Sequence, residues 1–171
     1  MAANADIGRR KGYEALDRFD MSILNVLAED GRISITEMSA RIGLSKSPTQ
    51  ARLRRLETEG YVLGYRAIVD PILLGLDHVA FVEVRLSDTR EPALSAFNAA
   101  VLKTTEVEQA HMIAGNFDYL LKVRTRDMTQ YRQVLADVIS GLPYVASTST
   151  FVAMEAVKEI ALAGPDHVEV T

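Results

Sequence analysis

The sequence predicts an α+β fold in two parts: a helical N-terminal unit, and a C-terminal unit in which strands and helices alternate. Up to about residue 59, apolar residues recur at the three- and four-residue spacing of helices, with glycine or acidic stops between the segments. After about residue 77, short β-rich runs alternate with helical segments. Asp70-Pro71 is a breaker between the two patterns and marks the boundary.

Two helices are predicted before residue 43. The first is indicated by an apolar stripe with helical spacing and by the stop Glu29-Asp30-Gly31. The second is predicted to begin at Ser34, because Ser34 and Glu37 have the spacing of a capping box. Gly43 is predicted to end it. The stripe of the first helix consists of Leu16, Phe19, Ile23, Val26 and Leu27.

A third helix is predicted from Ser45 to about Glu59. The three residues Gly43-Leu44-Ser45 separate it from the second helix, which is the length of a helix-turn-helix corner. The short β-rich runs Tyr61–Leu63 and Tyr65–Val69 are predicted to form a hairpin or hinge that closes a winged-helix-like domain. Helical spacing then sorts the side chains of the third helix: Thr49, Leu53 and Leu56 inward, and Ser47, Gln50, Ala51 and Arg54 outward.

The charge pattern predicts an anionic partner at one face. The net charge is −4, but residues 1–66 carry 11 Lys and Arg against 9 Asp and Glu. Within them, the run Met38–Leu56 holds five cations and no acid. An ordinary surface helix with solvated arginines would also fit, but the three-helix unit with its glycine corner favours binding of double-stranded DNA.

Position on the third helix predicts the DNA contacts. A dimer that reads a near-palindrome is expected, because one helix reads only a few base pairs. The outward residues Ser47, Gln50 and Arg54 are candidates for base edges. The candidates for phosphate contacts are Lys46, Arg52, Arg55 and the helix N-terminus at Ser45.

The second half has the element order βαββαβ, which is the ferredoxin-like pattern. Two helices on one face of the sheet would leave the other face bare, so a second copy of the chain is expected to cover it. The strands are predicted at Val79–Leu86, Val107–Ala114, Tyr119–Arg124 and Val145–Met154, and the helices at Glu91–Lys103 and from Asp127 to Gly141.

The run Ala114–Tyr119 has two interpretations. It can be a plain hairpin turn, in which Gly and Asn are common. It can also bind a ligand, if the backbone at Gly115 receives a carboxylate and Asp118 holds an ammonium group. Thr148 and Thr150 share one strand face and could line the same pocket, although β-propensity alone explains them.

Several classes of protein are disfavoured. Without cysteine there are no disulfides or thiolate metal sites, and the three histidines lack metal-ligand spacing. No apolar run is long enough to span a membrane, and the N-terminus does not read as a signal peptide. No nucleophile or phosphate-loop motif is present, so no enzyme is expected. The expected location is the cytoplasm.

Motifs in both halves resemble those of one regulator family, over about Leu16 to Glu159. In the first half they are LDRFD from Leu16, DGRIS from Asp30, GLS from Gly43, and RRLE from Arg54 followed by Gly60-Tyr61. In the second half they are HMIAGNFDYLL from His111 and FVAME from Phe151. The family is that of the Lrp/AsnC (leucine-responsive, feast/famine) transcriptional regulators.

This resemblance implies a homodimer that assembles further, often to an octamer, with an amino acid bound between effector domains. The run Gly75–Arg90 looks most like the branch that activates a proline dehydrogenase gene, which implies proline, with leucine the other candidate. Asn116 stands where the family often has Asp, which removes a negative charge beside the site. By position, the resemblance implies ligand contacts from Met112, Ala114, Gly115, Asn116, Phe117, Asp118, Met128, Thr148, Thr150 and Val152.

Two other functions stay open: a winged-helix regulator with a non-amino-acid effector, and an amino-acid-sensing regulatory subunit of an enzyme. The predicted division is a disordered tail over 1–15, a helix-turn-helix DNA-binding domain over 16–62, hinge strands or a linker over 63–76, a ligand-sensing and dimerisation domain over 77–160, and a C-terminal tail over 161–171.

Overall fold

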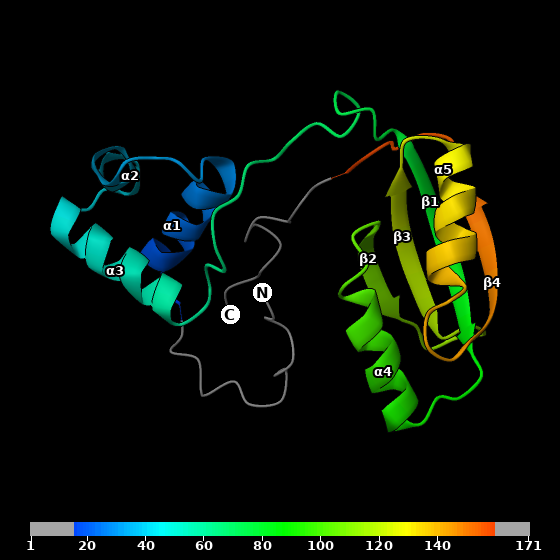
Figure 1. Ribbon diagram of the computed structural model, residues 1–171. Helices are drawn as coiled ribbons and strands as arrows, with labels where there is room; N and C mark the ends of the chain where they lie inside the picture. Colours follow the sequence, from blue (N-terminus) through cyan, green and yellow to red (C-terminus); the bar gives the residue numbers. More distant parts are fainter. Residues whose placement is uncertain (1–15, 160–171) are drawn as a thin grey trace. The chain divides into compact units, whose positions relative to one another are not determined.

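The computed structural model describes residues 16–159, which form two compact units that divide between Ile68 and Val69 (Figure 1). This division falls inside the predicted linker 63–76. The predicted tails over 1–15 and 161–171 lie outside the described residues. The first unit is helical, and the second contains the sheet.

The N-terminal unit consists of α1 (Arg18–Glu29), α2 (Ile35–Ile42) and α3 (Lys46–Thr58). Each helix supplies one fully buried apolar side chain: Ile23 from α1, Met38 from α2 and Leu56 from α3, all 0% exposed. The three predicted helices are therefore confirmed, and a small shared core holds them together.

The helix ends follow local side-chain chemistry. At the start of α1, Asp17 and Asp20 form a complete capping box, in which each carboxylate accepts from the backbone N–H of the other residue. At the start of α2, the Ser34 hydroxyl accepts from the Glu37 N–H at 3.1 Å, but the Glu37 carboxylate binds Arg41, so half of the predicted box forms. Gly43 ends α2 with φ of 73°, a conformation that favours glycine and turns the chain into the corner.

The predicted hinge strands Tyr61–Leu63 and Tyr65–Val69 are wrong: this stretch contains no strand. A strand needs a neighbour for its backbone hydrogen bonds, and none of the described residues provides one here. Leu63 and Ile68 are instead 92% and 83% exposed. The β-branched and aromatic residues of this stretch favour a strand locally, but the described residues offer no second strand to pair with it.

The C-terminal unit is a four-stranded antiparallel sheet with strand order β2-β3-β1-β4, covered by helices (Figure 1). Its order along the chain is the predicted βαββαβ. The seven elements are β1 (His78–Leu86), α4 (Glu91–Val101), β2 (Val107–Met112), β3 (Tyr119–Thr125), α5 (Met128–Val134), a π-helical turn η1 (Leu135–Ile139) that continues α5, and β4 (Val145–Val152).

The two faces of this sheet differ in what covers them. On one face, Val82 and Val84 of β1 join Leu121 of β3, Phe97 of α4 and Tyr131 of α5 in a buried core. Because side chains alternate along a strand, Phe81 and its neighbours in the register point to the other face. None of the described helices packs on that face, which is called the open face below.

Candidate DNA-binding surface and effector-domain site

The exposed side of α3 is the candidate DNA-binding surface. Ser47, Gln50 and Arg54 are exposed, whereas Thr49 and Leu56 are fully buried, so the helix is oriented as predicted. Ser45 precedes the helix, and its side chain makes no capping hydrogen bond. Its carbonyl accepts from the Thr49 N–H and hydroxyl, which fixes the first turn.

Arg52 and Arg55 turn back from this surface toward α1. Arg52 donates to Asp20 Oδ1 at 2.9 Å and lies 2.7 Å from Asp17 Oδ2. Arg55 donates to Asp20 Oδ2 at 2.6 Å. The hydrogen bond to Asp20 raises the pKa of the Arg52 guanidinium above its ordinary value. Each of the two guanidinium groups already has an anionic partner within the chain. The phosphate contacts predicted for Arg52 and Arg55 stay a prediction.

The remaining three cations of the run Met38–Leu56 are of two kinds: Arg41 forms ion pairs, and Lys46 and Arg54 do not within residues 16–159. Arg41 donates to Glu37 at 2.9 Å and lies 3.7 Å from Glu29. Within residues 16–159, Lys46 and Arg54 make no ion pair. The run contains no acidic residue in its sequence. In the structure, however, acidic residues from outside the run form ion pairs with three of its five cations.

In the C-terminal unit, the turn between β2 and β3 is tied to β1. The Asp118 N–H donates to the Val84 carbonyl at 2.9 Å, and Asp118 Oδ2 accepts from the Leu86 N–H at 2.7 Å. The Ile113 N–H donates to the Asp118 carbonyl at 2.8 Å. The Asp118 carboxylate, predicted to hold an ammonium group, therefore uses one oxygen to fix its own turn.

The predicted ligand residues form two separate groups in one chain. The turn group, Met112 and Ala114–Asp118, runs from the edge strand β2 to the start of β3. The β4 group has Thr148, Thr150 and Val152 on the opposite edge strand and Met128 at the start of α5. Since β3 and β1 lie between these edges, Met112 on β2 is about 14 Å from β4 at ~4.8 Å per strand, whereas Asp118 is bonded to β1 and is one strand closer. A single chain does not bring the two groups together.

Tyr131 of α5 is a neighbour of the β4 group that does not belong to the predicted ligand set. Its hydroxyl lies 2.5 Å from Thr150 Oγ1, and the residue is 1% exposed. Thr150 is opposite Val82 in the register, and Thr148 is opposite Val84, so both threonines point to the helix-covered face. The contact between Tyr131 and Thr150 joins elements 19 residues apart, and no local pattern could have revealed it.

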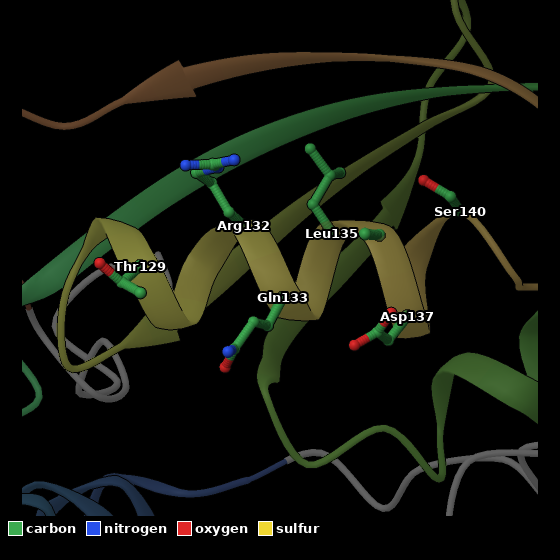
Figure 2. A pocket seen from close by; sticks show the side chains of 7 residues that line it. Thr129, Arg132, Gln133, Leu135, Asp137 and Ser140 are labelled. Atoms are coloured by element: carbon green, nitrogen blue, oxygen red, sulfur yellow. The ribbon is translucent and has the colours of Figure 1, made fainter.

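A depression on the C-terminal unit follows the outer side of α5 and η1 (Figure 2). The described residues that line it come from one helical segment and the serine after it, so they supply one wall only. An amino-acid site buries its ligand between opposing walls. None of these residues belongs to the predicted ligand set. They are Thr129, Arg132, Gln133, Leu135, Ala136, Asp137 and Ser140.

Among residues 16–159, no helix has both the length and the apolar character needed to cross a membrane.

Comparison with family models identifies both units. Residues 16–62 match the winged helix-turn-helix DNA-binding model, and residues 79–162 match the Lrp/AsnC ligand binding domain. Both matches follow the division seen in the structure.

Relatives and solved structures match over nearly the whole chain. The proline dehydrogenase transcriptional activator of Rhizobium radiobacter is 62% identical over 84% of this chain and 92% of its own length. The leucine-responsive regulatory protein of Salmonella typhimurium is 45% identical over 90% and 93%. The structure of a transcriptional regulator from Neisseria meningitidis in complex with L-Met matches with TM-score 0.82 and 31% identity, covering 90% of this chain and 99% of that one.

Proposed function

The chain belongs to the Lrp/AsnC family of transcriptional regulators, which makes it a DNA-binding protein that responds to an amino acid, and we propose that this amino acid is proline. The regulated gene would then encode a proline-degrading enzyme, and the site of action would be the cytoplasm. The observation that carries the proposal is the 62% identity to a proline dehydrogenase transcriptional activator.

The proposed DNA contacts are those of the exposed α3 side. Ser47 and Gln50 offer hydrogen-bonding groups to base edges, and Arg54 offers a guanidinium that suits guanine. Lys46 and the N-terminus of α3 at Ser45 offer phosphate contacts. The absence of an ion pair on Lys46 and Arg54 within residues 16–159 supports their assignment to the duplex.

Reversing the charge of Arg54 is expected to weaken binding to DNA from upstream of the chain's own gene by about five- to 150-fold, because one good base contact contributes ~1–3 kcal/mol. Fluorescence anisotropy at fixed salt measures this for Arg54→Glu. The matched control is Lys103→Glu, which makes the same charge change on an exposed residue of the C-terminal unit. Equal losses in both variants would mean that net charge, and not α3, governs the affinity.

We further propose a homodimer that assembles to a higher oligomer, with an octamer as the expected size. The open face of the sheet supports this, because a second copy could cover it. The separation of the predicted ligand residues supports a ligand site between copies. The turn group of one copy would face the β4 group of another, so that the amino acid stabilises one assembly over others.

Proline is expected to raise the melting temperature of the full chain, since a ligand that binds only the folded state stabilises it. The gain is ~2.7 kcal/mol at a hundredfold excess over the dissociation constant. Differential scanning fluorimetry against the twenty amino acids measures the shift, with D-proline as a control for nonspecific effects. A shift with leucine and none with proline would assign leucine as the effector, and no shift with any amino acid would contradict the proposed site.

A further inference from the structure

One carboxylate holds two of the cations that the sequence assigned to DNA. Asp20 is 1% exposed, and both its oxygens are in use: Oδ1 accepts from Arg52, and Oδ2 accepts from Arg55 and from the Asp17 N–H. We infer that Asp20 limits the electrostatic affinity of the chain for DNA, because it keeps Arg52 and Arg55 from neutralising phosphates. This inference rests on the proposed α3 surface.

The geometry around Asp20 keeps both arginines in place. Arg52 is shared with Asp17 at 2.7 Å, and its guanidinium lies 5.6 Å from the centre of the Phe19 ring. Arg55 has a second acid, Glu59, at 3.8 Å. A buried carboxylate with all its partners satisfied is costly to disturb, because breaking one pair leaves an uncompensated charge. Moving either arginine to a DNA phosphate would therefore break an ion pair that joins α1 to α3 and destabilise the contact between the two helices.

This arrangement acts on the phosphate part of the DNA affinity and not on base readout. Affinity for unrelated DNA comes almost entirely from phosphates neutralised by Lys and Arg. Base readout by Ser47 and Gln50 does not depend on the cations that Asp20 holds. Two engaged arginines therefore lower the electrostatic part of the affinity, which unrelated and specific duplexes share, and leave base readout unchanged.

The test is Asp20→Asn in the full chain, which keeps the side-chain shape and removes the charge. Affinity is measured by anisotropy across a salt series, for the upstream DNA and for an unrelated duplex. We expect severalfold tighter binding to both duplexes. The slope of log affinity against log salt is expected to steepen by about 0.9 for each arginine released. A purely structural role would weaken binding to both duplexes and would not steepen the slope, which would overturn the inference.

A second variant covers the case in which Asp20→Asn does not fold. The triple change Asp20→Asn, Arg52→Gln and Arg55→Gln replaces the charged cluster with neutral amides. Its salt slope is expected to equal that of the wild type, whereas the matched change Lys46→Gln with Arg54→Gln is expected to reduce the slope. A slope reduced by about 1.8 in the triple variant would show that both arginines contact phosphates and would overturn the inference. A wild-type chain that ignores both duplexes would overturn the α3 surface itself.

Discussion

Replacing Leu56 by alanine is expected to unfold the N-terminal unit at temperatures where the C-terminal unit stays folded. Leu56 of α3 is fully buried against Ile23 and Met38, and these three are the fully buried apolar residues of that unit within the described chain. Truncating a buried leucine costs ~2–5 kcal/mol. A small domain has little more stability than that to lose. DNA binding is expected to disappear with the fold.

Circular dichroism and scanning calorimetry of Leu56→Ala measure this, with Leu63→Ala as the control. Leu63 is 92% exposed, so its truncation is expected to change stability by less than about 0.5 kcal/mol. Two transitions are expected in the variant, of which the lower one moves and the upper one does not. If both moved together, the two units would fold as one cooperative block, and the modular interpretation of the chain would be wrong.

The elements of the fold could be predicted because their signals are local. Ser34 and Gly43 bound α2 through groups a few residues away, and Asp127 caps α5 through the Gln130 N–H. The alternation along β3 follows directly from its sequence, in which every second side chain is buried. These features need no knowledge of what the segment packs against.

The partners of the charged residues could not be predicted from local patterns. By local rules alone, Asp20 is an acid near the positive N-terminal end of α1. In the structure it pairs with arginines 32 and 35 residues away, so the apparent excess of positive charge on α3 is partly neutralised. The run Met38–Leu56 misleads because charge is balanced in space and not along the chain.

Strand order is the other property that local patterns leave out. Local patterns place Met112 and Thr150 on strands. They do not reveal that β2 and β4, which carry these residues, occupy opposite edges of the sheet. The hinge runs failed for a related reason. Their β-propensity is real, but a strand forms only where a second strand supplies hydrogen bonds, and none of the described residues supplies them here.

Placing a charge on the open face by Phe151→Asp is expected to convert the proposed assembly into monomers. Phe81 and Phe151 are directly opposite each other in the register of β1 and β4, and they are 37% and 55% exposed. Beside them, Lys122 and Arg124 of β3 form ion pairs with Glu108, so these two cations are already compensated. An aromatic pair next to a neutralised charge cluster is a surface that a second copy can cover.

A twofold interface contains every substitution twice, which makes the expected effect large. Losing one buried aromatic contact costs ~1.5–3 kcal/mol, so two lost contacts cost at least about 3 kcal/mol. At 1.4 kcal/mol per tenfold, the dissociation constant rises more than about a hundredfold before the two desolvated carboxylates are counted. Sedimentation velocity measures the change. The control is Ala99→Asp, which places the same charge on the exposed side of α4. An intact assembly for Phe151→Asp together with a dissociated one for Ala99→Asp would move the interface from the open face to the helices.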